Sequence, residues 1–88
     1  MDINLFLNLE STEEDIIEYG FSRIVSCPVL PRKGDNIVID GHEHRAEHIY
    51  IDITDQKLEI SLNDWIVYNG EIEDIKTELE QTGWILEY

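Results

Sequence analysis

The chain has 88 residues, of which 42% are hydrophobic, and its formal net charge is −14 at pH 7. This length suits a single domain over residues 1–88, because chains usually divide into domains of about 100–200 residues. The charge argues against direct binding to nucleic acid or to an anionic membrane, since both would repel it. The longest apolar run, residues 65–68, is far shorter than the roughly 20 residues of a membrane span. The single Cys27 excludes an internal disulfide, which fits the reducing cytoplasm.

The negative charge is concentrated toward both ends of the sequence. Residues 1–20 carry six acids and no base, and residues 49–88 carry ten acids and two bases. Residues 21–48 are neutral, with four acids, four bases and three histidines. The fold decides whether the two acidic ends form one surface or lie apart, and the sequence leaves both arrangements open.

The first twenty residues predict a strand followed by a short helix. Apolar and polar residues alternate over residues 2–9, and Phe6 is the one apolar side chain on the wetter face. Ser11 and Glu14 match a capping box, and Gly20 is placed to end a helix. We therefore expect a helix of about two turns here, which depends on packing for its stability.

The rest of the chain predicts several strands and one longer helix. Strands are expected at residues 21–30, 36–40, 44–54, 57–63, 65–68 and 84–88. The third and fourth form a hairpin around Asp55 and Gln56, and Pro28 suggests that the first is an edge strand or carries a bulge. Within residues 71–82, Ile72, Ile75 and Leu79 follow the spacing of an amphipathic helix, which Gly83 ends.

These elements predict an α+β fold: a small bent antiparallel sheet or partly open barrel, with a short N-terminal helix and a C-terminal amphipathic helix. Residues 31–41 read Pro-Arg-Lys-Gly-Asp-Asn-Ile-Val-Ile-Asp-Gly. This Gly-Asp turn, followed by a strand, a longer strand and a hairpin, resembles the opening of small SH3-like β-barrels, over residues 22–68. The resemblance implies an SH3-like barrel whose second strand bends at a bulge between Ala46 and Ile49. Such barrels serve as adaptors, nucleic-acid binders and phage structural proteins, so the resemblance concerns the fold only.

The histidines form the densest group of candidate metal ligands. Residues 44–48 spell H-x-x-E-H, the inverted zinc-protease motif, but that chemistry requires a helix and a third ligand. Because a strand is expected here, we predict no enzyme, no catalytic residue and no cofactor. On a strand His42 and His44 lie on one face about 7 Å apart, so the two could bind a zinc ion together. His48 would be a third ligand if no bulge intervenes. The alternative is that all three are exposed polar side chains.

Other candidate chemistry has ordinary structural explanations. Cys27 lies in an apolar segment, which suits a small buried side chain better than a nucleophile. Carboxylate pairs are numerous, but so small a domain offers little cleft for glycoside hydrolysis. Trp65, Tyr68, Trp84 and Tyr88 could form a recognition surface, although we expect the tryptophans to pack in the core.

The acidity is therefore the strongest functional signal. One net charge for about every six residues destabilises a small core by self-repulsion, so something must compensate for the charge or require it. A basic partner would require it, whereas a solvated acidic face is the alternative explanation for any single residue. We expect a non-enzymatic inhibitor that mimics nucleic acid and binds a basic protein, such as a nuclease or another nucleic-acid-binding protein. The setting would be anti-defence by a phage or mobile element, or immunity to a toxin. The predicted partner-binding residues lie on the two expected helices: Glu13, Glu14, Asp15, Glu18, Glu71, Glu73, Asp74 and Glu78.

The alternative hypothesis is an SH3-like adaptor or structural subunit that binds through an aromatic and apolar edge. Salt distinguishes the two, because charge-driven association weakens within a few hundred millimolar salt whereas apolar contacts persist.

Overall fold

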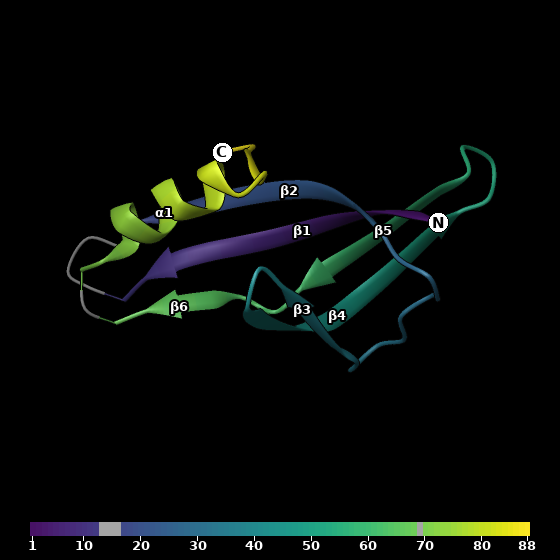
Figure 1. Cartoon of the computed structure of the whole chain (residues 1–88), viewed down its shortest axis with the longest axis horizontal. Helices are drawn as coiled ribbons and strands as arrows, with labels where there is room; N and C mark the ends of the chain where they lie inside the picture. Colours follow the sequence, from purple (N-terminus) through teal and green to yellow (C-terminus); the bar gives the residue numbers. More distant parts are fainter. Residues whose placement is uncertain (13–16, 69) are drawn as a thin grey trace.

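The computed structural model describes residues 1–12, 17–68 and 70–88. Within these residues the elements are β1 (Asp2–Ser11), β2 (Glu18–Ser26), β3 (Asn36–Ile39), β4 (His42–Asp52), β5 (Lys57–Leu62), β6 (Trp65–Val67), α1 (Ile72–Gln81) and β7 (Ile85–Leu86). The molecule is elongated, with extents of 42 × 24 × 23 Å. The start of α1 lies at one end and the β4–β5 hairpin at the other (Figure 1).

The strands form one mixed sheet in which β1 is central. The strand order is β3-β4-β5-β1-β2-β7, and β6 also pairs with β1. β2 runs antiparallel to β1, whereas β5 and β6 run parallel to it along its other edge. Asn4 pairs with Glu59 and Leu9 pairs with Trp65, so the register shifts by one residue between β5 and β6.

This architecture corrects the predicted fold class. Among the described residues, strands make up 54% and helix 12%, and the mixed sheet is not closed. The predicted α+β fold, a bent antiparallel sheet or partly open SH3-like barrel with a short N-terminal helix, is therefore wrong. The error has a physical cause: alternation predicts that a segment is a strand but does not specify which strand it pairs with.

The expected helix between Ser11 and Gly20 is wrong as well. Ser11 ends β1, and in β2 Glu18 and Gly20 pair with Glu10 and Asn8. A helix of about two turns is marginal by itself, so the continuous ladder with β1 is the more stable arrangement.

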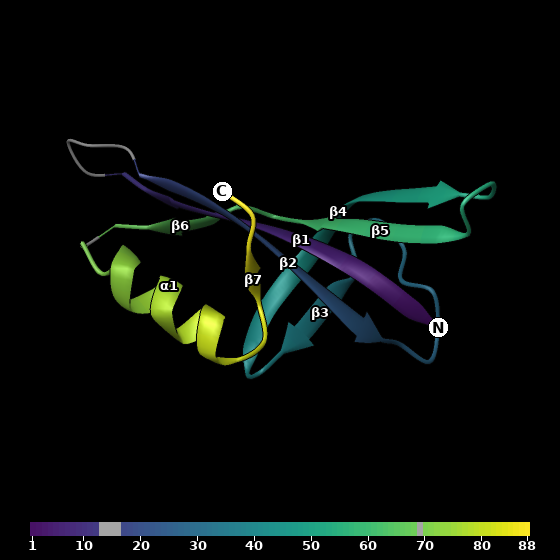
Figure 2. The same cartoon turned by 90° about the horizontal axis from the view of Figure 1, so that it is seen from above.

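The core lies on one face of the sheet, and α1 runs beside that face at one end of the molecule (Figure 2). The odd-numbered apolar side chains of β1 are at most 2% exposed, and they are Ile3, Leu5, Leu7 and Leu9. Ile72 and Leu79 of α1 are buried in the same cluster. The alternation of residues 2–9 and the amphipathic C-terminal helix are thus confirmed.

The hairpin formed by β4 and β5 is confirmed, but its loop is longer than predicted because Asp52 pairs with Lys57. The bulge implied for β4 is present as a register shift between Ala46 and His48. β2 ends before Pro28 and pairs with both β1 and β7, so it is not an edge strand.

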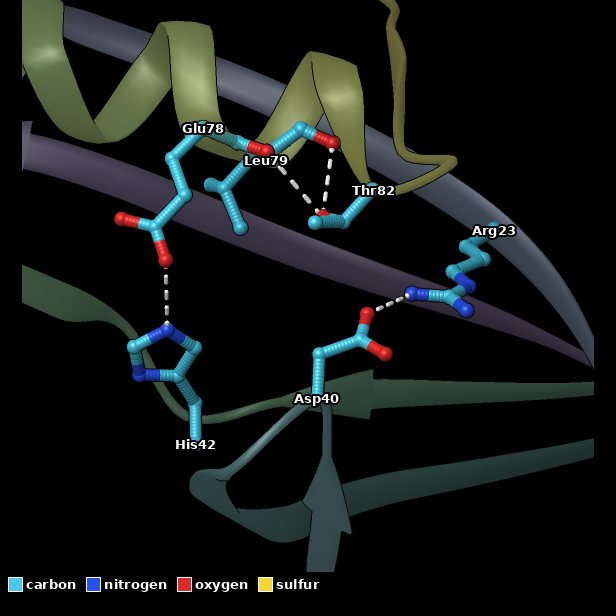
Figure 3. Close-up of polar contacts among 6 residues, drawn as sticks. All are labelled: Arg23, Asp40, His42, Glu78, Leu79 and Thr82. Atoms are coloured by element: carbon cyan, nitrogen blue, oxygen red, sulfur yellow. Dashed lines mark hydrogen bonds and ion pairs between the residues drawn. The ribbon is translucent and has the colours of Figure 1, made fainter.

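Side chains hold the β3–β4 hairpin near α1 and β2 (Figure 3). Asp40, between β3 and β4, accepts a hydrogen bond from Nη1 of Arg23 on β2 at 2.5 Å. His42 Nε2 lies 3.1 Å from Glu78 Oε1 on α1. The Thr82 hydroxyl lies 3.1 Å from the carbonyl oxygens of Glu78 and Leu79, where α1 ends. The sheet therefore curls toward closure through side-chain contacts.

Candidate functional site

The end of the molecule where α1 begins carries several of the predicted partner-binding acids. Glu71 immediately precedes α1, and Glu73 and Asp74 lie in its first turn. β2 begins at the same end (Figure 1). The Tyr19 hydroxyl of β2 donates a hydrogen bond of 2.5 Å to Glu73, and this bond raises the pKa of Tyr19. The contact joins β2, in the acidic N-terminal part of the sequence, to α1, in the acidic C-terminal part.

A second group of carboxylates lies on the opposite face of the sheet near this end. Glu10 of β1 and Glu18 of β2 are direct cross-strand partners, and Asp64 precedes β6. The pKa of Glu10 is raised, first by its loss of hydration and then by the charges of Asp64 and Glu18. Like charges placed this way repel one another, and a cationic partner would relieve the repulsion.

Acidic residues therefore occupy two faces of one end, and Glu10 and Asp64 were not among the predicted partner-binding residues. Successive strand residues point to opposite faces, so Glu18 points away from Tyr19 and from α1. We name the set Glu10, Glu18, Asp64, Glu71, Glu73 and Asp74 the acidic end.

Two parts of the prediction fall outside this set. Glu13, Glu14 and Asp15 lie outside the described residues. Glu78, near the other end of α1, contacts His42 and joins α1 to β4.

The three histidines do not form one group. The rings of His42 and His44 both contact Trp65, with the His42 ring tilted at a centroid distance of 4.9 Å, and His44 also contacts Trp84. His48 lies beyond the bulge. Over residues 1–12, 17–68 and 70–88, no group of three or more His, Cys, Asp or Glu is arranged to hold a metal. The H-x-x-E-H sequence lies on β4, so it lacks the helix that zinc-protease chemistry requires.

His44 differs from the expected exposed histidine, since its exposed fraction is 6%. Its pKa is lowered, first by burial and then by the neighbouring His42. Burial disfavours the charged imidazolium, so His44 contributes to the core as a neutral ring.

The remaining candidates behave largely as core residues. Trp84 is buried and Trp65 packs against the core, which confirms the expectation for the tryptophans, while Tyr68 and Tyr88 are exposed. Cys27 is partly buried against the core, and its thiol donates a hydrogen bond to the Val29 carbonyl at 2.9 Å.

The structure also contains a pocket that the sequence did not predict, on the face of the sheet opposite α1. Its volume is about 420 Å³. It is lined by Asn4, Phe6, Leu7, Asn8, Gly20, Phe21, Ser22, Ser61, Leu62, Asp64, Glu87 and Tyr88. The one sequence signal for it is Phe6, an apolar side chain on the wetter face of its strand.

Comparison of the chain with protein-family models, curated proteins and solved structures finds no match. Among the described residues, no helix has the length and apolar character needed to cross a membrane. The fold and the surface together define a mainly β protein that has one helix among its described residues and a strongly acidic end.

Proposed function

We propose that this chain is a non-enzymatic binding protein whose acidic end recognises a basic surface on another protein. The observation that carries the proposal is the position of carboxylates on both faces of the end where β2 and α1 begin. The raised pKa of Glu10 supports it, because crowded like charges lower stability unless a partner neutralises them.

The basic residues of the chain neutralise this end only in part. Lys76 is the one base on α1; its ammonium group lies 2.8 Å from Glu80 and 5.3 Å from the centre of the Tyr19 ring, and its charge also acts on Glu73. Arg23 and Arg45 pair with Asp40 and Glu47, which are not part of the acidic end. The negative potential there would attract a basic protein and accelerate its association.

A nucleic-acid-binding protein is the partner class that fits this surface best. Its groove binds phosphates that recur about every 3.4 Å of helix axis on each strand, and clustered carboxylates also present dense negative charge. By occupying that groove, the chain would exclude the nucleic acid. Inhibition of a nuclease, as anti-defence by a phage or mobile element or as immunity to a toxin, is the activity we propose.

The first test is capture from a bacterial lysate with the whole chain as bait, followed by elution in a rising salt gradient and mass spectrometry. We expect a nucleic-acid-binding protein that elutes within a few hundred millimolar salt, because screening weakens exposed charge pairs over about 8 Å at physiological salt. Added DNA or RNA should also displace it. If every captured partner resists salt and ignores nucleic acid, the proposal is wrong.

Charge reversal then locates the surface. The triple variant Glu18→Lys, Glu71→Lys and Asp74→Lys should lose the captured protein. The matched control, Asp2→Lys, Glu43→Lys and Asp55→Lys, changes the net charge equally at exposed positions outside the acidic end. Equal losses in the two variants would mean that net charge, and not this surface, determines binding.

A second candidate function is the adaptor or structural subunit that binds through an apolar edge. β3 pairs with β4 only from His42 to Arg45, so the outer edge of β4 beyond the bulge has no ladder partner among the described residues. Ile51 of β4 is 61% exposed there, and Ile53 in the following turn is 85% exposed. A partner that binds this edge would persist at high salt.

A further inference from the structure

The pocket on the open face of the sheet has a floor built from three adjacent strands. Phe6 of β1 lies directly opposite Ser22 of β2 and Ser61 of β5, so these three side chains share one face. Asn4 and Asn8 lie two residues to either side of Phe6 on the same face. The volume of about 420 Å³ lies within the roughly 300–1,000 Å³ of small-molecule sites.

The segment after β7 forms one wall, and its position is fixed by β2. Gly20 donates a backbone hydrogen bond to Tyr88 at 2.9 Å and accepts one from Glu87 at 2.7 Å. The Tyr88 ring lies so close to Gly20 that a Cβ there would approach ring atom Cε1 to 2.3 Å. Only glycine therefore allows this ring position.

Side-chain hydrogen bonds hold the polar groups of the wall in place. The Tyr88 hydroxyl donates to Asn8 Oδ1 at 3.2 Å. The Ser22 hydroxyl donates to Glu87 Oε1 at 2.5 Å. The Glu87 carboxylate and the Tyr88 ring are thereby positioned before any ligand arrives. This favours binding, because fewer side chains lose conformational entropy when the ligand binds.

The residues that line the pocket favour a cation that can also stack on aromatic rings. Glu87 and Asp64 supply negative charge, and no lysine, arginine or histidine is among the described residues that line the pocket. The asparagine side chains add amide oxygens, and Phe6 and Tyr88 add aromatic surface. A guanidinium group is planar, stacks on aromatic rings and offers five donors, whereas the ammonium of lysine is compact and strongly hydrated.

We infer that this pocket binds the side chain of an arginine presented by the basic partner. The inference rests on the proposed function for the source of the arginine, and it adds a second, specific contact on the face of the sheet that also bears Glu10 and Glu18. Charge attracts the partner, and the pocket distinguishes arginine from lysine.

A titration with short peptides tests the pocket without the partner. The whole chain, labelled with ¹⁵N, is titrated with acetyl-Gly-Arg-Gly-amide and with the same peptide containing citrulline, the neutral analogue of arginine. We expect saturable shifts at the side-chain amides of Asn4 and Asn8 and at the backbone of Glu87, with affinity for citrulline at least about tenfold weaker. Equal affinities, or shifts confined to other regions, would overturn the inference.

Variants sharpen the test. Glu87→Gln with Asp64→Asn should weaken arginine binding by about tenfold. The control, Glu43→Gln with Asp55→Asn, removes the same charges elsewhere and should leave affinity within about twofold. Phe6→Leu, which keeps an apolar side chain, should also weaken binding while the backbone spectrum stays that of the folded protein. Wild-type affinity in the Phe6 variant and in the double variant would disprove the site.

The two proposals fail separately. If the chain captures a salt-sensitive basic protein but does not bind the arginine peptide, the pocket inference is wrong and the proposed function stands. If the peptide binds but capture fails, the pocket is a site for arginine side chains and the proposed inhibitor function is wrong.

Discussion

The two faces of β1 differ completely in chemistry although they belong to one strand. Its odd-numbered residues, from Ile3 to Leu9, are apolar and buried in the core. Its even-numbered residues, from Asn4 to Glu10, are mostly polar and partly exposed, and they line the pocket or join the acidic end. Because alternation separates the faces, one side of the strand supplies stability while the other is free for recognition. Substitutions one residue apart should therefore have very different effects.

The largest difference is expected between Leu5 and Phe6. Leu5→Ala removes a fully buried side chain and should lower the free energy of unfolding by about 2–5 kcal/mol. Phe6→Leu, on the open face, should lower it by less than about 1.5 kcal/mol. Urea unfolding of both variants measures the values, and equal losses would contradict the division between the faces.

On the buried side, His44 should make stability depend on pH. Its pKa is lowered by burial and by His42, so below about pH 6.5 the unfolded chain binds more protons than the folded one. This part of the stability is complete well above that pH and is lost as the pH falls through about 6.5 toward 5.5, by at most about 1.4 kcal/mol per pH unit. In His44→Gln this part of the slope should disappear. If urea unfolding gives the same dependence of the unfolding free energy on pH for the wild type and His44→Gln, the prediction is wrong.

On the open side, Gly20→Ala tests the close contact with Tyr88. The added Cβ has to displace the ring, which should lower the free energy of unfolding by about 1 kcal/mol. In a Tyr88→Ala background the same substitution should have little effect, because the clash is gone. Additive effects in this double-mutant cycle would mean that the ring does not rest on Gly20.

The smallest predicted effect concerns the repulsion around Glu10. Glu10→Gln removes one of three neighbouring charges and should raise Tm by roughly 1–4 °C at pH 7. The raised pKa means that the folded protein takes up this proton more readily than the unfolded chain, so the gain should vanish near pH 4. Thermal unfolding at both pH values, with Glu43→Gln as the control, measures it. A lower Tm at pH 7 would show that Glu10 stabilises the fold.

The sequence predicted those parts of the fold that local periodicity determines. The buried face of residues 2–9, the hairpin of β4 and β5 and the helix with Ile72 and Leu79 all follow from the spacing of apolar side chains. The pairing of β1 with β5 and β6 depends on segments more than fifty residues away, which no local pattern encodes.

The predicted parts of the candidate site are likewise those that local sequence spacing determines. The acids before and within the first turn of α1 were expected on a helix, and Glu71, Glu73 and Asp74 lie there. Glu18 was expected on a helix but lies on a strand, because tertiary pairing outweighs a weak helical preference. The pocket escaped prediction because the register of β2 with the last residues brings Tyr88 over Gly20.

The parallel pairing of β1 also affects how the protein is made. Asn4 pairs with Glu59, which the ribosome adds 55 residues later. At a synthesis rate of about 5–20 residues per second, roughly 3–11 s pass before this partner of β1 is made. During this time one edge of β1 lacks a strand partner and can pair with other chains. During that interval mutual repulsion between the acidic nascent chains opposes aggregation. The charge would then protect the protein during synthesis, before it meets any partner.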